Sequence, residues 1–240
     1  MIEYIDKPIN LDSIVIRGKN IDQDLGLVVN LKKGDVVNIH RLVIDNTFVP
    51  FTFMGEGRIN VTGSIECLNW SGDLVDLWAC HVFIAKLYGI GHNPTRDYEL
   101  YHPDAIQAEK LVNYKGDPSY ALCDINIPEI DVTMAGERSA GISLTGRGDN
   151  YGLHFGTKKL HLKVPNNDHV VNAYQARECS FGGLDVDVSG DIYIRNRKNR
   201  NNHKTENVSV VNVPINSRSQ GIVVPSIHNN PLGVLGRNFV

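Results

Sequence analysis

Short runs in which apolar and polar residues alternate recur along most of this chain. Alternation with a period of two places one face of a β-strand in the core and the other in solvent. Apolar residues hold a helical spacing almost nowhere, so we expect an all-β protein with little helix. The predicted strands are residues 13–17, 36–44, 58–62, 81–87, 125–127, 159–164 and 191–195.

The spacing of equivalent apolar positions indicates a repeat. Val37, Ile59 and Val82 are separated by 22 and 23 residues, the length of one coil in a solenoid of short strands. The later positions Ile125, Leu160 and Ile192 follow at 43, 35 and 32 residues, as expected if loops are inserted at the corners. An antiparallel sandwich is the alternative, but its hairpins favour Asn-Gly or Asp-Gly turns, and the chain contains neither. We therefore predict a right-handed parallel β-helix.

The chain divides into two parts that differ in their pattern of apolar, polar and proline residues. Residues 1–195 carry the strand pattern and form the predicted β-helix domain, with a loop insertion near residues 89–120. Residues 196–240 are polar at first and then contain Pro214, Pro225 and Pro231. Such a composition is typical of an irregular C-terminal segment, which would cap the stack or make an oligomer contact.

Charge and apolar content exclude several classes of protein. The 240 residues are 42% hydrophobic and carry a formal net charge of -3. The basic run from Arg195 to Lys204 lies among asparagines. Nucleic acid is therefore not an expected partner. No stretch approaches the roughly 18 to 20 apolar residues of a membrane span. The acidic start of the chain, Met1 to Asp6, does not resemble a signal peptide, and we expect no export by the usual route.

The cysteines are widely spaced and include no CxxC pair, which predicts free, buried thiols and folding in a reducing cytoplasm. They are Cys67, Cys80, Cys123 and Cys179. No zinc-protease, nucleophile-elbow or phosphate-loop motif occurs in the sequence, and we expect neither a metal site nor a cofactor.

One segment carries a family resemblance. Tyr101-His102-Pro103-Asp104-Ala105-Ile106-Gln107 resembles the His-Pro-Asp-Gly-Ile-Gln type sequence of right-handed parallel β-helix proteins related to pectate lyases and phage tailspikes. Ala105 stands where glycine is more usual in that pattern. The resemblance implies a strand that opens on the groove face of a coil, and it specifies an architecture better than an activity.

The same segment contains the first candidate site. His102 and Asp104 are two residues apart and can share a strand face, as an acid and base pair. Tyr101 and Gln107 are candidate substrate-binding residues beside them. The alternative is that Asp104 caps the turn after Pro103.

A second cluster lies about one coil earlier, between Trp70 and Trp78. It contains Asp73 and Asp76, and stacking could bring either of them close to Asp104. Two carboxylates that flank a sugar bond can perform glycoside hydrolysis, and Trp70 and Trp78 could pack against sugar rings. Alternatively, residues 71–73 form a β-turn and both tryptophans fill the end of the core.

Polysaccharide cleavage by β-elimination remains open as well, because it needs a base and a positive group to neutralise the sugar carboxylate. The candidates for these roles are His102, Lys110, Arg138 and His154, and His154 is also a candidate substrate-binding residue. An active protein would therefore be a polysaccharide lyase or a glycoside hydrolase.

These features are compatible with a virion protein that leaves its host by lysis and meets polysaccharide from outside. We expect a phage tailspike-like protein, folded in the host cytoplasm, that forms a homotrimer, contacts other tail proteins and binds cell-surface polysaccharide. The first alternative is a non-enzymatic baseplate or cell-puncturing spike protein, in which the stack provides rigidity. An intracellular scaffold or adhesin is a third class that stays open.

Overall fold

The computed structural model describes residues 8–78, 81–94, 103–109, 123–136, 139–145, 153–164, 171–174, 180–182, 184–188, 190–197, 209–211 and 219–223. These residues form strands and connections without a helix, so the all-β prediction is confirmed. No helix in this part of the chain has the length and apolar character needed to cross a membrane. Within the predicted insertion, residues 89–92 and 104–109 belong to strands, and residues 95–102 and 110–120 lie outside the described residues.

The described strands all pair in parallel. They are β1 (Ile9–Arg17), β2 (Leu27–Leu31), β3 (Val36–Thr47), β4 (Phe51–Gly55), β5 (Arg58–Trp70), β6 (Val75–Trp78), β7 (His81–His92), β8 (Asp104–Glu109), β9 (Cys123–Asn126), β10 (Glu129–Thr133), β11 (Ala140–Thr145), β12 (Leu153–Thr157), β13 (Lys159–Val164), β14 (Val171–Tyr174), β15 (Ser180–Gly182), β16 (Leu184–Val188), β17 (Gly190–Arg197), β18 (Ser209–Val211) and β19 (Ser219–Val223). Each predicted strand coincides at least partly with one of these strands. The parallel pairing excludes the antiparallel sandwich for this part of the chain.

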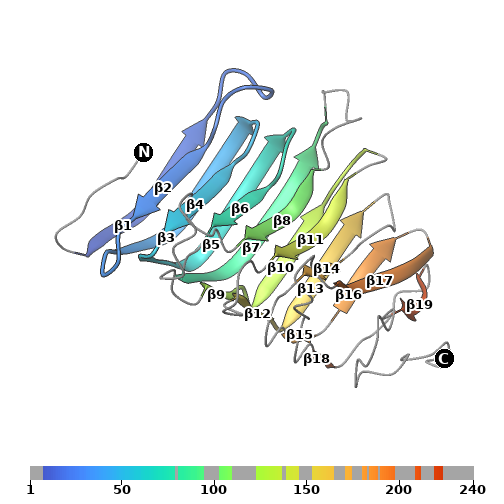
Figure 1. Cartoon of the computed structure of the whole chain (residues 1–240). Coiled ribbons are helices and arrows are strands. Elements are labelled where there is room, and N and C mark those ends of the chain that lie inside the picture. The colour runs from blue at the N-terminus through green and yellow to red at the C-terminus, as the bar shows by residue number, and fades with distance from the viewer. Residues whose placement is uncertain are drawn as a thin grey trace.

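The strands build two sheets that the chain visits in turn (Figure 1). In the first, called here the long sheet, the order is β1-β3-β5-β7-β9-β12-β15-β18, and β10, β13 and β16 form a branch from β7. The second sheet has the order β2-β4-β6-β8-β11-β14-β17-β19. After β7 the long sheet divides, because the early part of β7 pairs with β9 and the later part with β10. Each repeat of the chain therefore adds strands to the same end of both sheets.

The positions that are 22 and 23 residues apart in the sequence are structurally equivalent. Val37, Ile59, Val82 and Ile125 are successive partners across β3, β5, β7 and β9. The extension to Leu160 and Ile192 is wrong: Leu160 pairs with Ile130 on the branch, and Ile192 lies in β17 of the second sheet. The cause is the division of the long sheet, which gives later repeats an additional strand.

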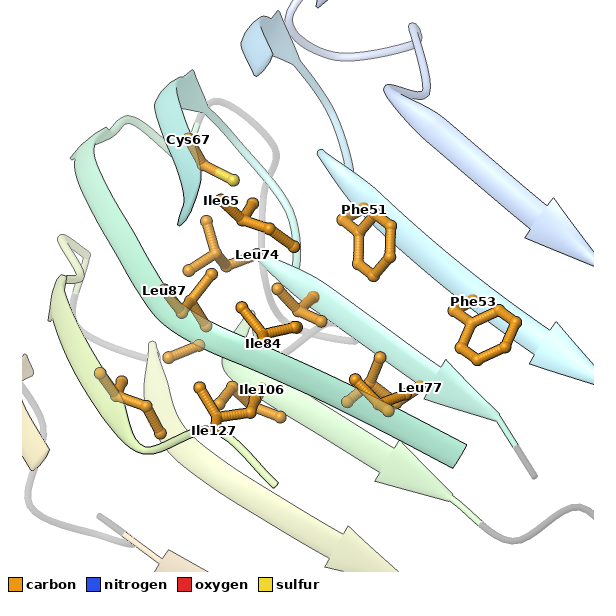
Figure 2. Close-up of a cluster of buried hydrophobic side chains, with 14 of the residues drawn as sticks. Phe51, Phe53, Ile65, Cys67, Leu74, Leu77, Ile84, Leu87, Ile106 and Ile127 are labelled. Atoms are coloured by element: carbon orange, nitrogen blue, oxygen red, sulfur yellow. The ribbon is translucent and has the colours of Figure 1, made fainter. Parts of the chain in front are cut away.

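The core lies between the two sheets and consists of the inward residues of successive strands (Figure 2). Phe51 and Phe53 of the second sheet, and Ile65, Ile84 and Leu87 of the long sheet, are all fully buried. Burial of such a side chain contributes about 1.5–3 kcal/mol to the free energy of unfolding, relative to an exposed side chain. Successive repeats therefore hold together through a continuous apolar column rather than through separate cores.

Cys67 belongs to this core. It is free and fully buried, which confirms the thiol prediction at this position, and burial raises the pKa of its thiol. Cys80 and Cys179 lie outside the described residues, and so does the side chain of Cys123.

One corner of the repeat is built from residues with left-handed backbone conformation. Asn46 and Asn69 have φ angles of 58° and 52°, and Gly91 has a φ of 88°. Asn69 Nδ2 donates to Asp45 Oδ1 at 2.9 Å, and Asn46 Nδ2 donates to the Gly18 carbonyl at 2.9 Å. Asparagine and glycine tolerate this conformation better than other residues. The same turn is thus repeated three times and linked from repeat to repeat.

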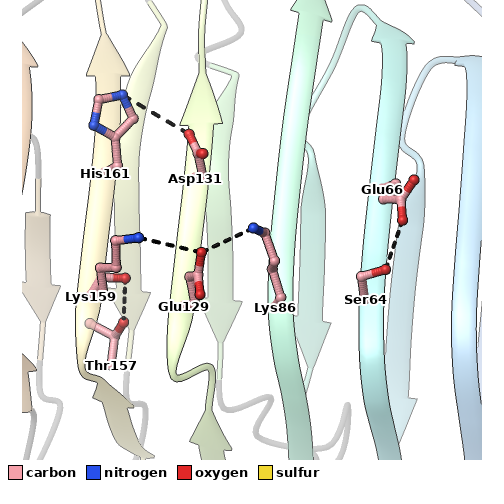
Figure 3. A network of polar contacts seen from close by, with 8 residues as sticks. All are labelled: Ser64, Glu66, Lys86, Glu129, Asp131, Thr157, Lys159 and His161. Atoms are coloured by element: carbon pink, nitrogen blue, oxygen red, sulfur yellow. Dashed lines mark hydrogen bonds and ion pairs between the residues drawn. The ribbon is translucent and has the colours of Figure 1, made fainter.

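Charged side chains line the outer face of the long sheet (Figure 3). Glu129 lies between two lysines, with distances of 3.0 Å to Lys86 Nζ and 3.5 Å to Lys159 Nζ. The hydrogen bond from Lys86 holds the pKa of Glu129 below its usual range. Exposed ion pairs of this kind each contribute roughly 0–1 kcal/mol to the free energy of unfolding. The two pairs of Glu129 therefore align the neighbouring strands more than they stabilise them.

Candidate functional site

Asp73 lies beside Asp104, and it is one of the two neighbours, Asp73 or Asp76, that the sequence left open for Asp104. The main-chain N–H of Asp104 donates to Asp73 Oδ1 at 2.7 Å, and the N–H of Leu74 donates to the Asp104 carbonyl at 3.0 Å. Both aspartates are buried, with 3% of Asp73 and 7% of Asp104 exposed. The Asp73 carboxylate therefore fastens the start of β8 to the connection before β6.

Three other predicted residues share the outer face of the second sheet. In β6, Val75 and Leu77 point into the core, so Asp76 and Trp78 point outward. Asp76 is the register partner of Gln107 in β8, which is also half-buried. A carboxylate, an indole ring and an amide are thus placed on two adjacent strands.

The flanking strands extend this surface, which we call the Trp78 face. Thr52 and Met54 of β4 are the partners of Asp76 and Trp78, and Ser143 of β11 is the partner of Gln107. Thr52 is buried, whereas the other side chains are half-buried. The Trp78 face therefore carries a row of polar side chains at the strand spacing of about 4.8 Å, namely Thr52, Asp76, Gln107 and Ser143. Trp78 lies two residues along β6 from this row.

Trp70 has a different position from Trp78. It is fully buried in the corner column between Thr47 and His92, and its ring lies 5.2 Å from the His92 ring at an interplanar angle of 30°. It offers no exposed face to a ligand. Of the two alternatives drawn from the sequence, core filling therefore describes Trp70, and an outward aromatic surface describes Trp78.

His92 is the buried histidine of this region. Burial lowers its pKa to about 4, and the Ala135 N–H donates to its Nδ1 at 3.0 Å. A ring nitrogen that accepts a hydrogen bond carries no proton, so the neutral ring is protonated at Nε2. His92 thus acts as a structural acceptor at the corner.

The remaining predicted site residues cannot be placed in this arrangement. Tyr101 and His102 lie outside the described residues, so the proposed pairing of His102 with Asp104 stays a prediction. The backbone of His154 lies in β12 beside Asp124 of β9, but its side chain is outside the described part. Lys110 and Arg138 are outside it as well.

Sequence reasoning missed the polar rows that parallel strands create. Asn38 and Asn60 are 22 residues apart, the same spacing as Val37 and Ile59, and Asn60 Nδ2 donates to Asn38 Oδ1 at 2.8 Å. A search for polar residues at the repeat length could have found them. The residues described contain no group of three or more His, Cys, Asp and Glu side chains that could hold a metal ion.

Comparisons of this chain with protein-family models, with curated proteins and with solved structures found no match.

Proposed function

We propose that this protein is a phage tailspike-like virion protein, a right-handed parallel β-helix that binds host surface polysaccharide on the Trp78 face. The β-helix proposal is supported by the alternation of the chain between parallel sheets and by the left-handed corners at Asn46, Asn69 and Gly91. An inserted loop would account for the longer separation between Val82 and Ile125.

The observation that carries the binding proposal is the juxtaposition of Asp76, Trp78 and Gln107. The apolar face of an indole can cover the C–H face of a sugar ring, while carboxylate and amide groups bind its hydroxyls. Because the row of polar side chains runs across the strands, the Trp78 face suits an extended chain of sugar units rather than a single small molecule.

Binding should depend on Trp78. Titration with oligosaccharides from capsule and lipopolysaccharide of candidate hosts should show at least 10-fold weaker binding for Trp78→Ala, because the ring supplies most of the apolar contact. Tyr88→Ala is the matched control, since Tyr88 is a half-buried outward aromatic residue on the long sheet. Equal affinities of the Trp78→Ala variant and the parent protein would remove the Trp78 face from the proposal.

Cleavage is measured separately, by new reducing ends for hydrolysis and by absorbance of an unsaturated uronate for β-elimination. If Asp104 is catalytic, Asp104→Asn should lower turnover by about 100-fold at an almost unchanged melting temperature. Turnover equal to that of the parent protein would exclude Asp104 as the acid or base.

The second candidate function is a non-enzymatic baseplate or cell-puncturing spike protein. It is favoured by the use of the Asp73 carboxylate as a main-chain acceptor in a buried position, which is a structural role. Asp73→Ala should then lower the free energy of unfolding by about 1–3 kcal/mol, because the Asp104 N–H loses its acceptor.

Asp73→Asn is the matched control for this measurement by chemical denaturation, since its amide oxygen can still accept the bond. Equal stability of Asp73→Ala and the parent protein would contradict the structural role. A host polysaccharide panel that is neither bound nor cleaved would favour the spike over the tailspike.

A further inference from the structure

A depression lined by both polar and apolar residues lies on the outer face of the long sheet, away from the Trp78 face. Its volume is about 370 Å³, and it is open to solvent. It lies across the N-terminal strands β1, β3 and β5, and its lining consists of Asn10, Leu11, Asp12, Asn38, Ile39, His40 and Thr62.

The register of the strands explains why polar groups meet there. Val37 and Ile39 are fully buried, so Asn38 and His40 point outward from β3. Asn10 is the register partner of Asn38, and His40 Nδ1 lies 3.3 Å from Thr62 Oγ1. The depression is therefore formed by neighbouring polar rows.

Gly63 shapes the wall beside His40. The register between β3 and β5 shifts at this point, which gives β5 one more residue than β3. A Cβ atom at Gly63 would lie 2.5 Å from the His40 carbonyl oxygen, so only glycine permits this approach of the two strands. The bulge keeps Thr62 next to the His40 ring.

The asparagines form a ladder that holds the lining in place. Asn60 Nδ2 donates to Asn38 Oδ1, and Asn38 Nδ2 donates to Asn10 Oδ1, each at 2.8 Å. Each amide nitrogen carries two N–H groups, and the ladder uses one of them at Asn38 and none at Asn10, which leaves donors for a ligand at both lining residues. Because the ladder fixes these side chains, binding would cost little side-chain entropy.

The charge of the lining limits the class of ligand. Asp12 contributes a carboxylate, and the lining contains neither lysine nor arginine. Hydroxyl groups can donate to Asp12 and accept from the asparagine amides, whereas an anion would meet the Asp12 charge without a lysine or arginine in the lining to compensate it.

We propose that this depression binds a neutral polyhydroxylated ligand of one or two sugar rings. Its volume is at the lower end of the range of ligand pockets, about 300–1,000 Å³. Since the lining has no phenylalanine, tyrosine or tryptophan ring, the dissociation constant should be on the order of 1 mM. The site is separate from the Trp78 face and does not depend on the function proposed above.

The test is saturation-transfer NMR on the full chain, with maltose as the neutral probe and digalacturonate as the anionic probe of the same size. Maltose should bind, and digalacturonate should bind at least 5-fold more weakly. Asp12→Asn and Asn38→Ala should each weaken maltose binding about 5-fold. Asp124→Asn is the matched control, because Asp124 is an exposed outward residue of β9 on the same sheet, and it should leave binding unchanged.

The same titration with Trp78→Ala separates this site from the Trp78 face. Unchanged maltose binding supports the depression, whatever the variant does to host polysaccharide. Loss of maltose binding in Trp78→Ala would place the sugar on the other face and overturn the inference. Failure of maltose to bind the folded parent protein, or equal binding in Asp12→Asn and Asn38→Ala, would overturn it as well.

Discussion

His92 couples the stability of the corner column to pH. Its ring is neutral in the folded protein because burial lowers its pKa to about 4, compared with 6.5 for an ordinary histidine. Above pH 6.5 the folded and unfolded states are both neutral at this position. Between pH 6.5 and 4 the unfolded chain takes up a proton that the folded protein does not, so stability falls as the pH falls.

We therefore expect the free energy of unfolding to decrease by at most about 3 kcal/mol over this range through His92 alone. Urea denaturation at several pH values should show a smaller decrease in His92→Gln, because glutamine cannot be protonated. The control is His40→Gln, since His40 is exposed. Parallel pH profiles of His92→Gln and the parent protein would contradict this role.

The burial of single residues was the least predictable feature of the candidate site. Stacking of neighbouring coils suggested either Asp73 or Asp76 as a neighbour of Asp104, but the sequence context does not show that the Asp73 carboxylate accepts a main-chain bond. The two tryptophans are eight residues apart in one segment, yet Trp70 ends a long strand in the core and Trp78 points outward from a short one. Which face a strand buries depends on its neighbours in the other sheet.

The long strands were predictable because apolar and polar residues alternate over many positions in each of them. β3, β5 and β7 contain the predicted strands and extend beyond them. The short strands β2, β4 and β6 of the second sheet were missed, because four or five residues show too few alternations to stand out. The division of β7 into two pairing regions was missed as well, since it depends on contacts with later repeats.

The left-handed corner lets the long strands turn toward the second sheet, and Asn69 is a direct test of it. A β-branched residue at φ 52° meets steric repulsion, so Asn69→Val should lower the free energy of unfolding by about 1–2 kcal/mol. Asn69→Gly loses the bond to Asp45 but adopts the same conformation freely.

Chemical denaturation should therefore rank the parent protein and Asn69→Gly above Asn69→Val. Because the two variants lose the same side-chain bond, the loss of that bond cancels when they are compared with each other. A valine variant as stable as the glycine variant would show that the corner does not require left-handed geometry.

For the whole molecule, two sheets of parallel strands leave extended outer faces. Among the described residues, β1 is the first strand of the long sheet and pairs with β3 alone, and its inward residues, such as Ile14 and Ile16, are only partly buried. Val15 on its outer face is 60% exposed. Exposed edges and apolar residues of this kind are commonly covered in an assembly.

We expect a homotrimer, in which three parallel stacks bury these surfaces around one axis. Light scattering at micromolar concentration should then give a mass of about 80 kDa, three times the 26.7 kDa of one chain. Val15→Lys tests whether the β1 surface takes part, because a buried lysine would weaken the assembly. Lys163→Ala is a surface control on β13, since Lys163 is exposed. A mass near 27 kDa at all concentrations would contradict the trimer, and an unchanged trimer in Val15→Lys would place the contact on another face of the stack.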